Sequence, residues 1–177
     1  MITEILTSGL LLISPIIPQN EPPDFRSVEC LAKNMYFEAR NQGSAGLLAV
    51  TAVVLNRVKD SRFPNTVCEV IEQGPTRESW KTRKHKILPV GKRKYYPIRH
   101  RCQFSWYCDG LTDNPKDKKT YNIYLNISKS ILSKQPFIDI TDGALFYHAD
   151  YVTPEWAKSR TRTCEIGDHI FYRWDTK

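Results

Sequence analysis

The stretch from Ala45 to Lys59 constrains the fold most, because it is apolar nearly all round. Leu47, Leu48, Ala49, Val50, Ala52, Val53, Val54 and Leu55 leave no broad polar face for water. A helix with this pattern lies at the centre of a protein, covered on all sides. Gly43 is expected to end the preceding helix and Ser44 to cap this one. At its polar end, Asn56 is expected to cap or orient backbone, and Arg57 to pair with an acid at the end of the preceding helix.

That preceding helix contains the stretch Leu31–Arg40. Val28, Leu31, Ala32, Met35 and Ala39 recur at spacings of three and four, which marks one buried helical face. Glu38 follows Leu31 by seven residues and lies within roughly 20° of it around the helix, so an acid continues the apolar face.

Two interpretations of Glu38 follow. The carboxyl either escapes to solvent or pairs with Arg40 or Arg57, or it lies in a partly dry cleft. In a dry cleft its pKa is raised, and the acid can deliver a proton at neutral pH. Periodicity alone favours the structural interpretation.

The positive charge of the chain is concentrated in one block. Residues 75–101 hold ten Lys or Arg and a single acid, Glu78, whereas the whole chain carries +7. Pro and Gly interrupt the block, so we expect a long loop or a hairpin around Val90–Lys92 and no helix longer than two turns. Its tryptophan and tyrosines alternate with cations, a pattern that suits single-stranded nucleic acid, an acidic polymer or a plain solvated insertion.

The 177 residues suit one domain with a separate N-terminal segment. Residues 1–25 are expected to form an apolar arm, or an export-like or anchor-like segment, that ends in a Pro-rich linker. The apolar run is short for a bilayer and fits a signal-peptide core, but Glu4 precedes it without any Lys or Arg. Residues 26–177 are then the functional domain, with 75–101 as a basic insertion.

The five cysteines are odd in number and have no metal-finger spacing. Cys30, inside the first helix, is expected to be a small buried hydrophobe. A disulfide from Cys68 to Cys102 or Cys108 is expected if the protein works outside the cytoplasm.

Shorter elements fill the rest of the chain. The patterns predict a short helix from Asn65 or Thr66 to Gln73, an aromatic strand or tight loop over 102–110, a helix over 120–134, strands over 144–148 and 166–172, and a helical turn over 154–157. The fold class is therefore α+β, a compact helical core with a small late β-sheet.

The histidines give no zinc-protease pattern. His148, Asp150 and His169 remain a candidate two-histidine–carboxylate zinc cluster across two strands. The chain has no nucleophile elbow and no Gly-rich phosphate loop. We therefore expect no metal and no organic cofactor, and Glu38 is the main candidate for chemistry.

Six segments, in order, resemble a known family. They are Tyr36–Arg40, Val54–Val58, Phe63–Cys68, Cys102–Gly110, Tyr147–Trp156 and Ile166–Tyr172. The chain is similar over these segments to the SleB/CwlJ-type cell wall hydrolases, which include spore cortex-lytic enzymes and bacterial and phage relatives. The resemblance implies peptidoglycan as substrate, cleavage of its glycan strand, Glu38 as catalytic acid, and a domain related in plan to lysozyme-like lytic transglycosylases.

A lytic transglycosylase can act with one Glu, whereas hydrolysing glycosidases normally need two carboxyls. Asp109, Asp150 and Asp168 lie near the motifs, but none has a signal comparable to Glu38. Candidates that orient sugar or acyl groups are Gln103, Ser105, Tyr147 and His148, and Trp106 and Trp156 are candidates for stacking on sugars. Each of these residues has a structural alternative, which for the tryptophans is a place in the core.

We expect a monomer that is exported or released to the cell envelope, in the periplasm or cell wall, and a phage lysis protein fits equally. Residues 75–101 would bind anionic wall polymers rather than a specific nucleic acid. Two rival functions stay open. One is a zinc-dependent N-acetylmuramoyl-L-alanine amidase or peptidase that uses His148 and His169, and the other is a nucleic-acid-binding protein built on the basic block.

Overall fold

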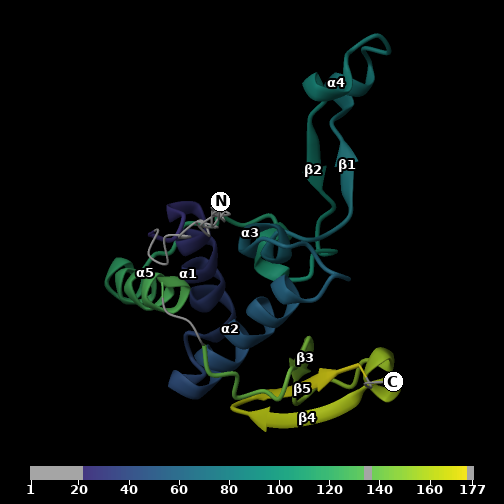
Figure 1. Ribbon diagram of the computed structural model, residues 1–177. Coiled ribbons are helices and arrows are strands. Elements are labelled where there is room, and N and C mark those ends of the chain that lie inside the picture. The colour runs from purple at the N-terminus through teal and green to yellow at the C-terminus, as the bar shows by residue number, and fades with distance from the viewer. Residues whose placement is uncertain (1–21, 134–136, 175–177) are drawn as a thin grey trace, which may run out of the picture.

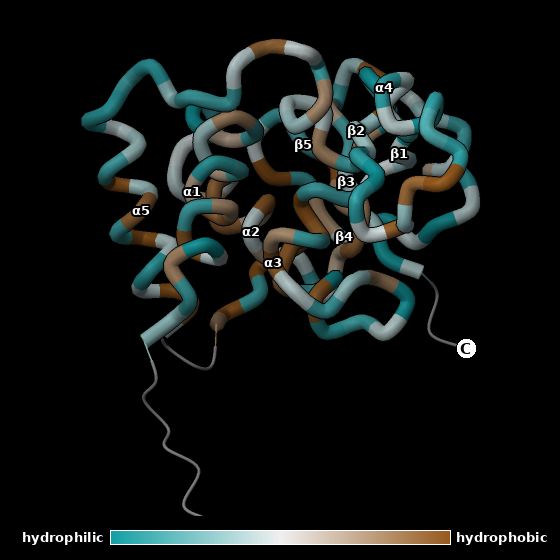
Figure 2. The backbone as a smooth tube through the Cα atoms, turned by 90° about the horizontal axis from the view of Figure 1, so that it is seen from above, coloured by the Kyte–Doolittle hydropathy of each residue, from teal (hydrophilic) through white to brown (hydrophobic). Residues whose placement is uncertain are grey.

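The computed structural model describes residues 22–133 and 137–174, so the predicted N-terminal arm lies almost wholly outside the described residues. Helix α2 (Gly43–Lys59) lies at the centre, in contact with α1 (Phe25–Ala39), α3 (Val67–Ile71) and the sheet (Figure 1). Nearly all of its residues from 46 to 55 are buried, as its apolar sequence predicts. Figure 2 shows many of the hydrophobic segments around α2, in the middle of the molecule.

The start of α2 differs from the prediction. The helix begins at Gly43, whose φ of +64° belongs to the left-handed region that favours glycine, and no side chain caps it. Ser44 is therefore not the cap. Gln42, which precedes the helix, instead donates to Asp168 Oδ2 (3.0 Å) and accepts from the Asp168 backbone N–H (2.9 Å), which ties this turn to the sheet.

The predicted buried face of α1 is confirmed. Val28, Leu31, Ala32, Met35 and Ala39 are all at most 5% exposed. Asp24 caps the helix by accepting from the backbone N–H groups of Arg26 and Ser27. Helix α5 (Lys118–Ser133) packs along α1 and buries Tyr121 and Ser128, while the predicted last residue, Lys134, lies outside the described residues.

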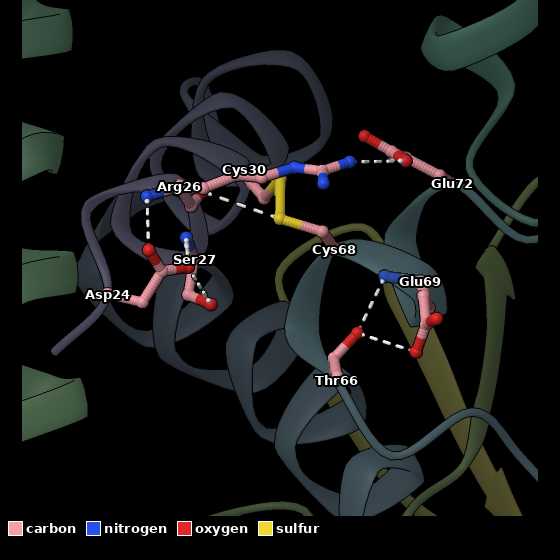
Figure 3. The surroundings of a disulfide bond; sticks show 8 residues. All are labelled: Asp24, Arg26, Ser27, Cys30, Thr66, Cys68, Glu69 and Glu72. Atoms are coloured by element: carbon pink, nitrogen blue, oxygen red, sulfur yellow. Dashed lines mark hydrogen bonds and ion pairs between the residues drawn. A yellow bond between two sulfur atoms is a disulfide. The ribbon is translucent and has the colours of Figure 1, made fainter.

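The disulfide prediction is wrong. Cys30 is bonded to Cys68, and Cys102 to Cys108. Because α1 packs against α3, the Cα atoms of Cys30 and Cys68 lie 5.4 Å apart, a relation that linear spacing does not reveal (Figure 3). Thr66 caps α3 as predicted, by accepting from the Glu69 backbone N–H.

The late sheet has three antiparallel strands in the order β3 (Phe146–Ala149), β5 (His169–Arg173) and β4 (Thr161–Ile166). The two predicted strands correspond to β3 and β5, but β4 was missed because its sequence is mostly polar. The turn between β4 and β5 contains Gly167, with φ +60°. Phe171, fully buried in the central strand, packs against Ala49 and Val53 of α2. These elements confirm the α+β class.

The basic block forms a hairpin that projects from the body (Figure 1). Strands β1 (Thr76–Glu78) and β2 (Tyr95–Pro97) pair, and the short helix α4 (Trp80–Arg83) and the 3-10 turn η1 (Val90–Lys92) lie between them. We call residues 75–101 the basic arm. The hairpin prediction is confirmed, and η2 (Ser105–Cys108) and η3 (Glu155–Ser159) are further 3-10 turns, the latter at the predicted helical turn. In the described part of the chain, no helix has the length and apolar character needed to cross a membrane.

Candidate active site

A cavity of about 410 Å³ lies where the end of α1 meets β3 and the loop before η2. Its lining residues come from five separate parts of the chain: Glu38, Arg57, Gln103, Phe104, Ser105, Phe146, Tyr147, Trp156 and Arg160. The loop residues Gln103 to Ser105 are enclosed by the Cys102–Cys108 disulfide, which fixes the ends of this short segment. We call this hollow the Glu38 cavity.

Glu38 lies at the last turn of α1 and faces the cavity. The Tyr147 hydroxyl donates to its Oε2 at 3.0 Å. Burial raises the pKa of the Glu38 carboxyl, and the bond from Tyr147 opposes that rise. Arg40 donates instead to the Tyr36 hydroxyl, and Arg57 to the Leu145 carbonyl. The geometry therefore fits the dry-cleft interpretation of Glu38 and not a salt bridge.

Arg57 is 4% exposed and lines the Glu38 cavity. Its Nε donates to the Leu145 carbonyl at 2.7 Å, and its guanidinium lies 5.2 Å from the ring centre of Phe63 and 5.5 Å from that of Phe104. Burial lowers its pKa to about 10. The prediction that Arg57 pairs with an acid of α1 is wrong, because its guanidinium group instead bonds to this carbonyl and packs against these rings.

Tyr147 is held in its neutral form. Burial and the neighbouring Glu38 carboxylate raise the pKa of its phenol well above the usual value. The hydroxyl therefore remains a hydrogen-bond donor toward Glu38 throughout the neutral range.

Arg160 is a cavity residue that the sequence did not indicate. Its guanidinium lies 4.3 Å from the ring centre of Phe146, and Nη1 donates to Ser159 Oγ at 3.0 Å. Its Nε is buried without a hydrogen-bond partner among the described residues. The residue follows the helical turn of Trp156 and belongs to none of the recognised motifs, so no sequence signal marked it.

Four of the six predicted substrate-binding residues line the Glu38 cavity: Gln103, Ser105, Tyr147 and Trp156. The other two lie elsewhere. Trp106 is buried, stacks on Phe37 at 4.9 Å, and donates from Nε1 to Asn34. His148 bonds through Nε2 to the Tyr172 hydroxyl at 3.0 Å and stacks on that ring.

The three aspartates near the motifs do not line the Glu38 cavity. Asp109 lines a separate cavity of about 370 Å³ beside Trp106. Asp168 is bonded to Gln42, and the Asp150 backbone N–H donates to the Asp168 carbonyl at the sheet turn. Among residues 22–133 and 137–174, Glu38 is the only carboxylate that lines this cavity.

The candidate zinc cluster is not assembled. In the antiparallel ladder, His148 lies opposite Ile170, while His169 lies opposite Ala149. Since side chains alternate along a strand, the two histidines face opposite sides of the sheet. Within the described ranges, no three His, Cys, Asp or Glu side chains are grouped closely enough to hold a metal ion.

Comparison with known proteins gives a consistent result. A family model described as Cell Wall Hydrolase matches residues 41–172, and so begins just after Glu38. The spore cortex-lytic enzyme of Bacillus cereus is 29% identical over 145 residues, which cover 81% of this chain and 43% of that protein. That of Bacillus subtilis is 26% identical over 164 residues, which cover 88% of this chain and 41% of that protein.

Two solved structures share the fold. The catalytic domain of the Bacillus cereus SleB protein has a TM-score of 0.52 and 26% identity, and the match covers 88% of this chain and 97% of that domain. The catalytic domain of the germination-specific lytic transglycosylase SleB of Bacillus anthracis has the same TM-score and identity, with 83% and 93% covered. The match thus spans less than half of these two full-length relatives but nearly all of the two solved catalytic domains.

Proposed function

The chain belongs to the Cell Wall Hydrolase family, and we propose that it cleaves the glycan strand of peptidoglycan as a lytic transglycosylase. The observation that carries the proposal is Glu38, the single carboxylate among the described residues that line the cavity, which has a raised pKa and one hydroxyl donor. The similarity to a structure described as a lytic transglycosylase supports it.

Glu38 has two tasks in this mechanism. Its protonated carboxyl first donates the proton to the glycosidic oxygen, and the bond from that oxygen to the muramoyl C1 breaks. The resulting carboxylate then removes the proton from the muramoyl 6-hydroxyl, whose oxygen attacks C1 of the same sugar and gives a 1,6-anhydro product. Burial favours the protonated acid that the first step needs.

A hydrolase would need a second carboxyl about 5–9.5 Å from the first, to act as base or nucleophile. Within the part of the chain that the structure describes, none of the other lining residues, such as Gln103 and Ser105, is an acid. Internal attack by the 6-hydroxyl removes the need for one, because the substrate supplies its own nucleophile.

The neutral lining residues are proposed to bind substrate. The Gln103 amide and the Ser105 hydroxyl can form hydrogen bonds with sugar or acyl oxygens, and the Trp156 ring can stack on a sugar. Tyr147 touches Glu38 and is proposed to orient its carboxyl. For Trp106 and His148 we propose structural roles, in view of their contacts with Asn34 and Tyr172.

The finer statements about the whole protein belong to the same proposal. Residues 26–177 act as the catalytic domain, as a monomer, on the peptidoglycan of the cell envelope, after export or phage-induced release. The basic arm attracts anionic wall polymers through its ten cations and single acid. Deletion of residues 77–99 should weaken co-sedimentation with purified walls, and the loss should shrink as salt rises.

The test is digestion of purified peptidoglycan by the wild type and Glu38→Gln, with products identified by mass spectrometry. Anhydro-muropeptides that disappear in Glu38→Gln support the proposal, with a rate loss of about 10²–10⁴-fold. Hydrated reducing ends would instead reveal a hydrolase, and freed stem peptides an amidase or peptidase.

A matched control is Glu29→Gln on the same helix. Nine residues separate the two acids, so at 100° per residue Glu29 lies about 180° from Glu38 around α1. Its variant should produce the same anhydro-muropeptides at the wild-type rate. Equal losses in the two variants would assign the effect to the helix and not to the Glu38 cavity.

A further inference from the structure

The basic arm carries a cavity of its own, of about 510 Å³. It is lined by Arg77, Glu78, Ser79, Trp80, Arg83, Tyr96 and Pro97. None of these residues lines the Glu38 cavity. We call this hollow the arm cavity.

Local geometry brings two aromatic rings and two guanidinium groups to this cavity. Arg77 lies directly opposite Tyr96 in the β1–β2 ladder, so both side chains lie on one face of the hairpin. Trp80 and Arg83 are three residues apart in α4, which places them on one side of that helical turn. Ser79 caps the turn and fixes its direction from the strand.

Both aromatic rings of the cavity are exposed to solvent. Trp80 is 56% and Tyr96 57% exposed. The Lys84 ammonium lies 4.2 Å from the Trp80 ring centre and adds positive charge beside it. Large exposed rings next to a hollow are typical of a surface that binds a ligand with an apolar face.

The cations of the cavity are not neutralised within the arm. Its one acid, Glu78, pairs with Arg93 at 3.1 Å, and both side chains are largely shielded from solvent. Among the described residues, neither Arg77 nor Arg83 forms an ion pair. Two guanidinium groups thus remain free for an anion, to which each can offer two parallel hydrogen bonds.

We propose that the arm cavity binds a sugar ring that carries an anionic substituent, within an anionic glycan of the wall. The ring stacks against Trp80 and Tyr96, while Arg77 and Arg83 hold the carboxylate or phosphate. The inference rests on the proposed function and extends it, since it gives the enzyme a second wall-binding site apart from Glu38. A nucleic acid is a poorer fit, because one hollow does not follow a run of phosphates.

The experiment uses the full chain with Glu38→Gln, so that walls are bound but not digested. Co-sedimentation with purified walls compares Arg77→Ala/Arg83→Ala with Lys86→Ala/Lys92→Ala, which removes two charges from the same arm outside the cavity. The cavity pair should weaken binding by about tenfold or more, since charge-assisted hydrogen bonds are lost, and the control pair by at most about threefold. Equal losses would overturn the proposal in favour of diffuse charge attraction.

A second comparison tests stacking without changing charge. Trp80→Ala should weaken wall binding by about fivefold to tenfold, and Trp80→Phe should retain most of it. Tyr95→Ala is the control, because Tyr95 is 50% exposed on the same arm but does not line the cavity. Full binding by Trp80→Ala would contradict a stacked sugar.

Further binding measurements identify the anion and test other partners. Binding to walls stripped of accessory anionic polymers distinguishes the phosphates of those polymers from the carboxylates of peptidoglycan. On intact and on stripped walls alike, Arg77→Ala/Arg83→Ala must lose more binding than Lys86→Ala/Lys92→Ala. Single-stranded DNA or anionic lipid vesicles that bind as tightly as walls, with the same dependence on Arg77 and Arg83, would overturn the proposal. Digestion of soluble peptidoglycan fragments by the chain with Glu38 intact tests the proposed function alone. A failure of the proposed function can therefore be distinguished from a failure of the arm cavity to bind the wall.

Discussion

The Tyr147 hydroxyl lies 3.0 Å from Glu38 Oε2, although 109 residues separate the two in the chain. The contact joins the end of α1 to the edge strand β3 and closes one side of the Glu38 cavity. It also stabilises the charged carboxylate over the neutral acid, because the hydroxyl donates to it. Burial acts in the opposite direction and is the larger influence on the pKa of Glu38.

Tyr147→Phe should therefore change the pH dependence of the reaction. Without the hydroxyl, the pKa of Glu38 rises further, and the acid stays protonated to higher pH. The alkaline limb of the pH–rate profile should move to higher pH, while the maximal rate falls about tenfold because the carboxyl is less well oriented.

The matched control for that variant is Tyr172→Phe. It removes a hydroxyl that bonds to His148 in the same sheet, away from Glu38. Its pH–rate profile should coincide with that of the wild type. A shift of similar size in both variants would show that the sheet, and not the contact with Glu38, sets the profile.

Glu38→Gln should change the pH dependence of stability as well. The folded-state pKa of Glu38 is raised, so the folded chain holds this proton more tightly than the unfolded chain. The wild type therefore loses stability as pH rises from the ordinary glutamate range through the raised pKa. Glu38→Gln lacks this loss, and its advantage in free energy of unfolding should grow over that window and then level off. Urea unfolding at several pH values measures it, and an advantage that shrank with rising pH would contradict a raised pKa.

The two disulfides should have different effects when removed. Cys30–Cys68 closes a loop of sequence separation 38, and Cys102–Cys108 one of separation 6. Loop entropy predicts that replacing the first pair with Ala costs about 4 kcal/mol of stability and the second about 2 kcal/mol. The second pair, however, holds the loop that carries Gln103 and Ser105 into the Glu38 cavity.

We therefore expect activity and stability to separate in these variants. At a temperature where both are folded, Cys102→Ala/Cys108→Ala should lower kcat/KM by about tenfold or more, and Cys30→Ala/Cys68→Ala should leave it near the wild-type value. Thermal unfolding and kinetics on the same samples measure both quantities. The reverse ranking in activity would mean that the loop does not need its disulfide.

Sequence reasoning succeeded where one local pattern determined the outcome. The apolar run of α2 predicted a central helix, and the apolar face of α1 was enough to place Glu38 in line with buried residues, although periodicity alone favoured a structural interpretation of its carboxyl. The breakers in the basic block likewise predicted a long loop or a hairpin, and the structure has a hairpin there. The periodicity of apolar residues shows which face of a helix or strand is buried, so it identifies the side chains on that face.

Predictions from the sequence were wrong or missing where the structure depended on how separate helices and strands pack together. Cys30 is paired with Cys68 only because α1 packs on α3, and β4 pairs with β5 in spite of a polar sequence. For Arg57, spacing suggested an acidic partner, but the fold brought a carbonyl and aromatic rings to it instead. Tertiary contact, which spacing along the chain does not encode, decided each of these cases.

Arg160→Met should reveal a binding role for the cavity residue that the sequence did not indicate. Arg160 lines the Glu38 cavity, where its guanidinium group can donate a hydrogen bond to a substrate oxygen. Methionine keeps an apolar chain against Phe146 but cannot donate, so KM should rise about tenfold with kcat nearly unchanged. Arg162→Met, two residues further on, breaks an exposed ion pair with Glu165 and should leave both constants unaltered. A fall in kcat at constant KM would instead place Arg160 in the chemical step, and wild-type kinetics would show that its guanidinium group does not bind substrate.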